Sequence, residues 1–343
     1  MNRLPAEWER QDAVMMAWPH PDTDWAYMLE EVKLCFHNIA KAIVNNGEML
    51  IIITPNVEET QKELSDLDSS KLQFVEIATN DTWARDMCPI ITFNNQTARI
   101  NDFKFNGWGL KFAADLDNLI NTKLFNKYHI FNGEYCNHLN FALEGGSIES
   151  DGEGTILTTA ECLLSPNRNG GSTKEEIDAY VRNAFEAEKV LWLDHGYLAG
   201  DDTDSHVDTL ARLAPNNTII YTCTDRKDDE HFEALNQMKA QLETFTNHKG
   251  EKFTLEEVPL PEAIYDEDGL RLPATYANFL IGNGFVLVPI YNQPKYDEKA
   301  LSVFAKVFPN HKIQGIDCNA LIKQHGSLHC VTMQIPENSL NLK

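Results

Sequence analysis

The chain has 343 residues, of which 43% are hydrophobic and 24% charged, and its 52 acidic and 29 basic residues give a formal net charge of −23. This composition is that of a globular protein able to bury a core. The acidic balance argues against nucleic acid as a partner, because phosphate binding needs a basic surface, whereas it is compatible with a cationic small-molecule ligand.

Two further features bear on the cellular setting. The first twelve residues, MNRLPAEWERQD, lack the basic-then-apolar plan of a secretory signal, and no run approaches the roughly 20 apolar residues of a membrane helix. We therefore expect a cytoplasmic protein without a membrane partner. The seven cysteines form no CxxC pair, which predicts free thiols rather than a structural zinc site.

Short strands and single helices alternate along the whole chain. In chain order the patterns predict a helix over 22–46, a buried strand over 50–54, a helix after the capping box at 173–176, strands over 189–194 and 217–223, a helix over about 228–245, a strand over 253–260, a hairpin over 277–291, a helix over 297–308, and strands over 312–316 and 328–335. No linker rich in Pro, Gly or Ser divides these elements. The pattern favours a single α/β domain over residues 1–343.

Four segments are dense in polar and special residues within apolar surroundings. They are Asn80–Asp86, Leu143–Ser147, Gly200–Asp208 and Gly326–Cys330. Because α/β proteins place ligand sites at strand ends, these segments are the candidates for a functional site.

Cys330 is a candidate nucleophile. A thiol becomes a nucleophile when a nearby base or positive field favours the thiolate, so a histidine partner is required. In His206-x-Asp208 the imidazole and the carboxylate are expected on one face of an extended segment. His329 is nearer in sequence, but on a strand it would point away from Cys330. The alternatives are a cysteine that only packs and a structural His–Asp pair.

Trp83 and Asp86 suggest a site for an organic cation. A carboxylate binds a planar guanidinium through paired, charge-assisted hydrogen bonds, and an indole face adds cation–π attraction. The alternative is that Trp83 belongs to the core and that Asp86 pairs with Arg85 or caps a turn.

A metal site is a second hypothesis for the acidic segment. Its candidate ligands are Asp201, Asp202, Asp204, His206 and Asp208. The segment does not match the spacing of an EF-hand loop, and the sequence contains no HExxH motif. The metal reading is therefore the weaker one.

Six motifs in order resemble the agmatine deiminases, which belong to the guanidino-group-modifying superfamily together with the peptidylarginine deiminases. They are TWARDMCP at 82–89, FNGWGLKF at 105–112, LEGGSIESDGEGTILTTAECLLSPNRN at 143–169, DDTDSHVDTLAR at 201–212, TYANFLIGNG at 275–284 and GSLHCVTMQIP at 326–336. The resemblance implies a pentein-type α/β propeller with five pseudo-fivefold ββαβ units around a central site.

The resemblance also implies a role for each of six residues. These are Cys330 as the nucleophile, His206 as the general acid and base, Asp86 and Asp208 as the carboxylates that hold the guanidinium, Trp83 as a side chain contacting the substrate, and Asp202 near the distal amine of the substrate. One departure is Ser205, where many relatives have glycine, and it bears on the backbone before His206.

The implied reaction is the hydrolysis of agmatine to N-carbamoylputrescine and ammonia through a thiouronium on Cys330, as a step of putrescine and polyamine biosynthesis. It requires neither a metal nor an organic cofactor. A deiminase of free, methylated or peptidyl arginine and a non-catalytic guanidinium-binding protein are the alternatives, with Arg85 and Arg212 as candidates to receive a substrate carboxylate. The segments 105–112 and 167–171 are candidates to close the site, and a homo-oligomer is compatible with the sequence.

Overall fold

A hairpin followed by a helix and a third strand is the repeated unit of this chain. The structure is a computed structural model that describes residues 2–341. In one unit β8 (Ile148–Ser150) pairs antiparallel with β9 (Thr155–Thr159), and α8 (Lys174–Phe185) leads to β10 (Lys189–Leu193), which is parallel to β9. The helix begins at the expected capping box, in which Thr173 and Glu176 exchange side-chain-to-backbone hydrogen bonds.

Three further units have the same plan. They consist of β5 (Ile90–Asn94), β6 (Thr97–Lys104), α4 (Gly107–Leu110), α5 (Ile120–Asn126) and β7 (Gly133–Ala142); of β11 (Ala211–Ala214), β12 (Thr218–Cys223), α9 (Phe232–Leu242) and β13 (Thr254–Pro259); and of β14 (Leu280–Gly282), β15 (Phe285–Ile290), α10 (Pro294–Val307) and β16 (Lys312–Asp317). In each, the first pair is antiparallel and the second is parallel.

The fifth sheet joins the two ends of the chain. Its order is β17 (Met333–Pro336), β2 (Gln11–Ala17), β3 (Met49–Thr54) and β4 (Leu72–Glu76), with α1 (Leu29–Asn45) and α2 (Val57–Glu63) between its parallel strands. β17 is antiparallel to β2, so the last strand supplies the hairpin partner that this unit lacks locally. A short β1 (Asn2–Arg3) pairs with β5. The pairing of β17 with β2, from opposite ends of the chain, closes the ring of units.

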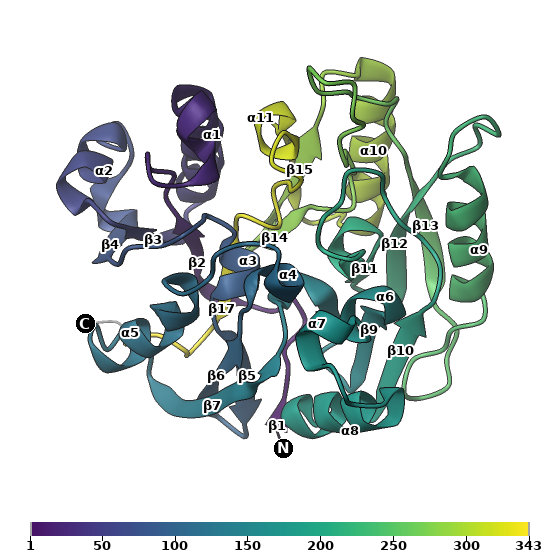
Figure 1. The fold of residues 1–343 in the computed structure, drawn as a ribbon, viewed down its shortest axis with the longest axis horizontal. Coiled ribbons are helices and arrows are strands. Elements are labelled where there is room, and N and C mark those ends of the chain that lie inside the picture. The colour runs from purple at the N-terminus through teal and green to yellow at the C-terminus, as the bar shows by residue number, and fades with distance from the viewer. Residues whose placement is uncertain (1, 342–343) are drawn as a thin grey trace.

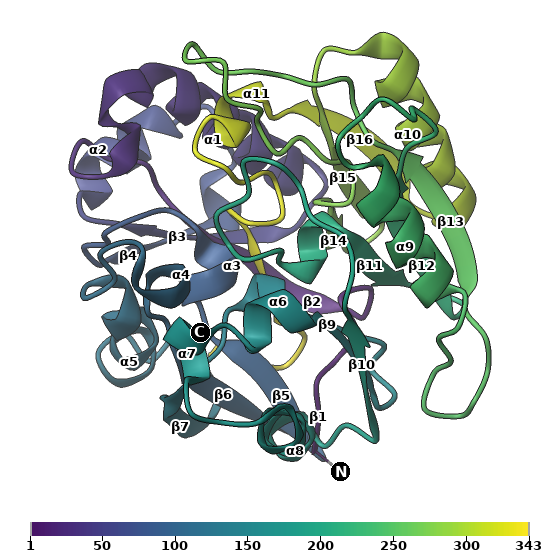
Figure 2. The same ribbon diagram turned by 45° about the vertical axis from the view of Figure 1, so that its right-hand side comes forward.

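The longer helices lie on the outside of the molecule, and two of the short helices lie near its centre. In Figures 1 and 2, α1, α8, α9 and α10 are peripheral, while α3 (Ala84–Met87) and α6 (Ala160–Leu163) lie toward the middle. Five of the six residues of β3, sequence MLIIIT, are buried, as expected for a parallel strand covered on both faces. The arrangement of five small sheets confirms the expected pentein-type α/β propeller.

Most predicted elements are present, and several are shorter than expected. The helix predicted over 22–46 begins as a 3₁₀ turn, Asp24–Met28, before α1. The strand predicted over 328–335 is wrong in its first half, because residues 328–331 form a turn and only β17 is extended. This second difference changes the geometry around Cys330.

Candidate functional site

Each of the five units contributes a polar residue from the segment just before its first strand. Asp86 precedes β5, Glu144 precedes β8, Asp208 precedes β11, Asn278 precedes β14 and Cys330 precedes β17. These five residues are at most 6% exposed. The pseudo-fivefold repeat therefore brings five segments that are far apart in sequence to one buried centre.

The carboxylate of Asp86 is fixed on both oxygens. The indole Nε1 of Trp108 donates to Oδ2 at 2.9 Å, and the backbone N–H of Gly146 donates to Oδ1 at 2.9 Å. Trp108 comes from α4, where it has a φ of 53° between Gly107 and Gly109, whose φ values of 66° and 85° are also positive. The two glycines allow the backbone to adopt this turn, and the turn brings Trp108 to the Asp86 carboxylate.

Gly146 leaves the space in which three site residues meet. A Cβ at this position would lie 2.7 Å from Nδ1 of His206, 2.9 Å from Oδ1 of Asp86 and 3.0 Å from Oδ2 of Asp208. Any side chain here would collide with all three groups. The close approach of the two carboxylates and the imidazole thus depends on glycine.

His206 and Asp208 meet in a different way from the one expected. The segment is not extended: His206 is the N-cap of a 3₁₀ turn, Val207–Thr209. Nδ1 of His206 lies 3.7 Å from Oδ1 of Asp86, and neither ring nitrogen has a hydrogen-bond partner within residues 2–341. Ser205, at φ 61°, has the left-handed backbone that favours glycine, and its N–H donates to Asp201 at 2.7 Å.

Cys330 lies against Asp208 and Asn278. Its Sγ is 3.9 Å from Oδ2 of Asp208 and 3.4 Å from Oδ1 of Asn278. Oδ1 of Asn278 also accepts the backbone N–H groups of His329 and Cys330, at 2.8 and 3.3 Å. Because these residues form a turn, His329 does not point away, and its Nδ1 is 2.7 Å from the same Asp208 oxygen. The expectation of opposite faces was wrong.

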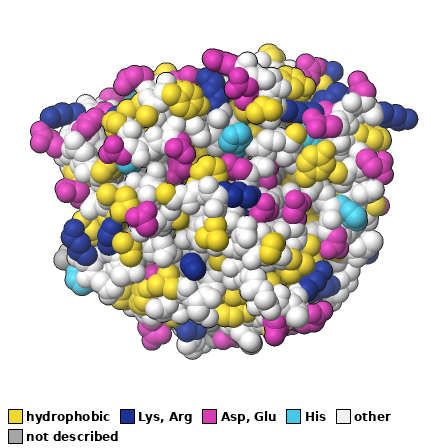
Figure 3. All heavy atoms as spheres, viewed as in Figure 1, with side chains coloured by type: hydrophobic (Ala, Val, Ile, Leu, Met, Phe, Trp, Pro, Cys, Tyr) yellow, Lys and Arg dark blue, Asp and Glu magenta, His cyan; other side chains and the backbone are white. Residues whose placement is uncertain are grey.

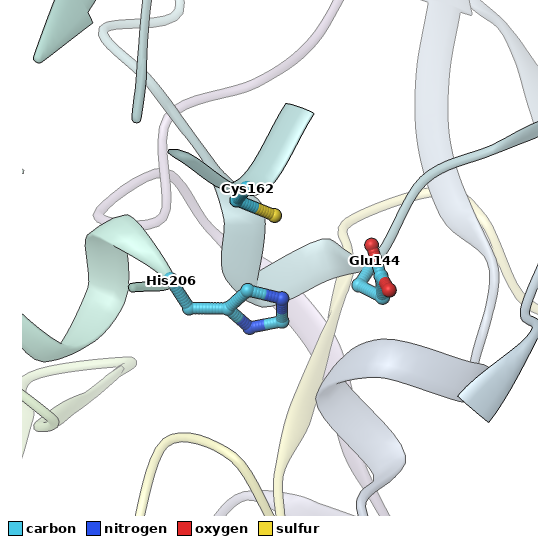
Figure 4. Close-up of side chains that lie close together, drawn as sticks. All are labelled: Glu144, Cys162 and His206. Carbon is cyan, nitrogen blue, oxygen red and sulfur yellow. The ribbon is translucent and has the colours of Figure 1, made fainter. Parts of the chain in front are cut away.

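A second carboxylate lies beside His206. Figure 4 shows the imidazole pointing toward Glu144, with the Cys162 thiol next to the ring, and donor atoms of all three lie within 4.8 Å of one another. Both Glu144 oxygens accept the Nε–H of the buried Arg168, at 2.9 and 3.0 Å. Arg168 also donates to the backbone carbonyl of Thr203 at 2.7 Å, which links Glu144 to the loop before His206.

The charge states follow from burial and from these neighbours. Burial, together with the Asp208 charge, raises the pKa of Asp86 to about 6, although His206 opposes the shift. Burial disfavours the His206 imidazolium, but Asp86 and the adjacent Cys162 outweigh it and raise the His206 pKa well above its usual value. Burial and the charges of Asp208 and Asp86 raise the pKa of the Cys330 thiol. Without a ligand the centre therefore holds a thiol and an imidazolium.

Asp208 remains ionised despite its complete burial. The hydrogen bond and charge of His329, with His206 and Arg212, outweigh burial and lower the Asp208 pKa. Its Oδ1 has no hydrogen-bond partner within residues 2–341. One oxygen of Asp208 is therefore held by His329, and the other is free to receive a cationic N–H donor.

A cavity leads from this centre to the surface. Its lining includes Asp24, Asp81, Trp83, Asp86, Trp108, Phe112, Asp202, Thr203, Gln324, His325, Gly326 and Cys330. Trp83 packs so closely on Gly326 that a Cβ there would lie 2.2 Å from the indole ring. Burial and the neighbouring Asp201 raise the pKa of Asp202 to about 6. All six residues expected at the site thus lie at the cavity or directly behind it.

The acidic segment does not assemble the metal site considered above. Asp204 pairs with Lys111 and Arg168, and Asp201 accepts hydrogen bonds within its own loop. Within residues 2–341, two groups have donor atoms at ligand spacing: Glu144–Cys162–His206, which contains one residue of that segment, and Glu7–Glu149–His329, which contains none. In both groups arginines already pair with the carboxylates. These donor sets fit a network of ion pairs better than a metal.

Three contributors were not singled out from the sequence. Glu144 lies in the motif at 143–169 and Asn278 in the motif at 275–284. The position of each residue just before the first strand of a unit is the signal that identifies it. Trp108 lies in the 105–112 segment, which was expected as a possible closing loop. Its side chain instead reaches Asp86, and Asn106 Nδ2 donates to the carbonyl of Asn167 at 2.9 Å, joining this segment to 167–171.

The acidic residues that give the chain its net negative charge are visible on the molecular surface. Figure 3 shows acidic side chains spread over the viewed face rather than gathered in one dense patch. Among residues 2–341, no helix has both the length and the apolar character needed to cross a bilayer.

Comparison with known proteins gives a consistent result. A Legionella pneumophila protein named "Putative agmatine deiminase" is 32% identical over 338 residues, covering 98% of this chain and 95% of that protein. The structure of a Cys→Ser variant of the C. jejuni agmatine deiminase with substrate bound is similar with a TM-score of 0.90 at 37% identity, covering 98% and 96% of the two chains.

A third comparison gives a related name. The structure described as the "Putative Arginine Deiminase from Porphyromonas gingivalis" has a TM-score of 0.94 and is 46% identical, covering 99% of this chain and all of that one. The family model described as Porphyromonas-type peptidyl-arginine deiminase matches residues 3–336. With this match over nearly its full length, the chain belongs to the Porphyromonas-type peptidyl-arginine deiminase family, and it is also similar to proteins named as agmatine deiminases.

Proposed function

We propose that this protein hydrolyses agmatine to N-carbamoylputrescine and ammonia, with Cys330 as the covalent nucleophile. The observation that carries the proposal is the convergence of Asp86, Asp208 and Cys330 at the inner end of a cavity that also contains Asp202. The carboxylates of Asp86 and Asp208, which both lie next to Gly146, favour a planar cation between them. The acidic outer lining favours a second positive charge at the other end of the ligand.

The lining supports agmatine over free arginine. Within residues 2–341, the cavity is lined by four aspartates, Asp24, Asp81, Asp86 and Asp202, and by one histidine, His325, but by no arginine or lysine. Arg85 and Arg212, which could have received a substrate carboxylate, instead pair with Glu7 behind the site. The carboxylate of arginine would therefore face like charges, whereas the ammonium of agmatine would face opposite ones.

The proposed first half-reaction begins with binding of the guanidinium. A cation between Asp86 and Asp208 offsets the two charges that raise the Cys330 pKa, so binding promotes release of the thiol proton to solvent and formation of the thiolate. The thiolate attacks the guanidinium carbon and gives a tetrahedral adduct. His206, protonated in the free enzyme, donates its proton to a nitrogen, which leaves as ammonia.

The second half-reaction regenerates the thiol. A water molecule attacks the central carbon of the remaining thiouronium, and its proton passes to the now neutral His206, which gives a second tetrahedral adduct. Collapse of this adduct breaks the C–S bond, the proton of its hydroxyl group passes to the departing sulfur, and the ureido product is released. Glu144, beside the ring and fixed by Arg168, is suited to orient His206 during both proton transfers.

The test is a ureido-product assay with agmatine, arginine and an N- and C-terminally blocked arginine peptide in parallel. We expect agmatine to have the highest kcat/KM. Preference for the peptide or for free arginine would overturn the agmatine assignment but retain a deiminase. A complete lack of turnover, with guanidines still binding, would instead support a guanidinium-binding protein.

A further inference from the structure

A second cavity lies along three strands of the ring. It is lined by parts of β5, β8 and β17 and by residues of the segment 4–11. Asp86, Glu144 and Cys330 lie just before the same three strands. Within residues 2–341, the lining of this second cavity shares no residue with the lining of the cavity that contains Cys330. The strands that follow the proposed active site therefore carry a separate cavity.

Arg85 lines this second cavity with a buried guanidinium. Its side chain is 3% exposed, and its Nη1 donates to Oε1 of Glu7 at 2.9 Å. Its Nε and Nη2 are buried and have no hydrogen-bond acceptor within residues 2–341. These two nitrogens form one edge of the guanidinium plane, and their parallel N–H groups match the two oxygens of a carboxylate. Because a buried donor without an acceptor is costly, this edge favours a bound acceptor.

The charges near Arg85 favour an anion as that acceptor. Glu7, the carboxylate that pairs with Arg85, also pairs with Arg212. Burial and the charge of Glu7 raise the pKa of Glu149, another lining residue, to about 8, although Arg212 opposes the shift. Glu149 is therefore largely protonated at neutral pH. Since Arg85 shares its carboxylate with a second arginine, its own charge is incompletely neutralised, which favours an anion over water at its unpartnered edge.

The rest of the lining suits a small polar ligand. In the more exposed part of the cavity, Arg3 donates to both oxygens of Glu9, so this carboxylate is also paired. Nε2 of Gln11 donates to the carbonyls of Glu7 and Ile281 at 2.8 and 2.9 Å, and its Oε1 has no donor within residues 2–341. The cavity volume of about 50 Å³ has room for about four water-sized groups. This is the size of acetate.

We propose that this cavity binds a small carboxylate, whose two oxygens accept hydrogen bonds from Nε and Nη2 of Arg85. The volume limits the ligand to acids of about the size of acetate or glycolate. The proposal does not depend on the function proposed above, because Arg85 does not line the cavity that contains Cys330. Water molecules at the same edge of Arg85 are the alternative, and the experiment separates the two.

The experiment follows binding of isotope-labelled acetate by ligand-observed NMR at pH 7, in a buffer that contains no other carboxylate. Arg85→Lys keeps a positive charge next to Glu7 but removes the edge with two parallel donors. Arg10→Lys is the matched control, because Arg10 lines the same cavity with a side chain that is 77% exposed and pairs with Glu337. Thermal melting checks that each variant folds.

We expect the unmodified protein and Arg10→Lys to bind acetate with dissociation constants in the millimolar range, and Arg85→Lys to bind it at least about tenfold more weakly. Benzoate, which is larger than the cavity, should not displace the acetate. Absence of acetate binding, equal weakening by the two substitutions, or displacement by benzoate would each overturn the proposal.

If Arg85→Lys does not fold, a crystal structure of the unmodified protein soaked in acetate decides. Electron density for a carboxylate across Nε and Nη2 of Arg85 supports the proposal. Water molecules alone at that position overturn it.

Discussion

The indole Nε1 of Trp108 donates a hydrogen bond of 2.9 Å to Oδ2 of Asp86, while Gly146 donates to the other oxygen. The carboxylate plane is therefore set by two donors from different units of the ring. Because the hydrogen bond from Trp108 favours the ionised form, it also lowers the pKa of Asp86, which burial raises to about 6. One indole, from a turn with positive φ, therefore contributes to both the orientation and the charge of this carboxylate.

Removal of the Trp108–Asp86 hydrogen bond should shift the acid limb of the pH profile of kcat/KM. Asp86 must be ionised to hold a guanidinium, so kcat/KM should fall as the pH decreases through about 6. In Trp108→Phe the Asp86 pKa rises further, and the acid limb should move to higher pH. The measurement is kcat/KM for agmatine from pH 4.5 to 8. Trp192→Phe is the control, because Trp192 makes the same kind of bond to Asp178, outside the site.

Substitution of the nucleophile should stop the covalent pathway. Cys330→Ser should lower kcat by at least about three orders of magnitude, since a serine hydroxyl at this position lacks the acidity of a thiol. Cys136→Ser, at a half-buried thiol beside Arg99, should retain full activity. Intact-mass spectrometry of rapidly quenched samples should show the thiouronium adduct in the unmodified protein. Substantial turnover by Cys330→Ser would show that another group is the nucleophile.

The role of Asp202 can be separated from that of Asp86 by the choice of substrate. Butylguanidine has the guanidinium of agmatine but no terminal ammonium. Burial raises the Asp202 pKa to about 6, so the ratio of kcat/KM for agmatine to that for butylguanidine should increase as the pH rises through that value. In Asp202→Asn the ratio should become independent of pH, with a loss of roughly tenfold, or about 1.4 kcal/mol, for agmatine only.

Asp225→Asn is the control for this series, because Asp225 is exposed and lies after β12, outside the cavity lining. Equal effects of Asp202→Asn on both substrates would mean that Asp202 supports the loop and does not contact the amine.

Local patterns in the sequence were sufficient for most of the elements. The capping box at Thr173 and the continuous apolar run of β3 specify their elements through short-range interactions, and both are present. The strand predicted through Cys330 failed because LHCV continues directly into the strand-like run of β17, whereas Asn278 holds the backbone N–H groups of His329 and Cys330 in a turn. That contact comes from another unit, and no local pattern reports it.

The site shows the same division between local and long-range information. The motifs located Asp86, His206, Asp208 and Cys330 at one centre, because each lies in a segment that is dense in polar residues. Glu7 gave no such signal, since it lies in a short polar stretch whose importance depends on contacts more than 70 residues away in sequence. Only the closed ring of units brings those partners to it.

The buried Arg168 should contribute strongly to stability. Its Nε donates to Glu144, its Nη1 pairs with Asp204 at 2.5 Å, and its guanidinium is fully buried. Arg168→Met keeps much of the volume but leaves the Glu144 carboxylate buried without its cation. Removal of one partner of a buried pair costs about 3–5 kcal/mol, because the remaining charge is uncompensated. We expect a decrease of that size in the free energy of unfolding, measured by urea denaturation followed by circular dichroism.

Arg182→Met is the matched control for Arg168→Met. Arg182 pairs with Asp178 one helical turn away in α8, and its side chain is 41% exposed. Exposed pairs of this kind contribute at most about 1 kcal/mol, because water screens the charges in the folded state and solvates them after the pair is broken. The two substitutions should therefore differ by at least about 2 kcal/mol. Equal destabilisation by the two substitutions would show that the buried pair contributes no more to stability than the exposed one.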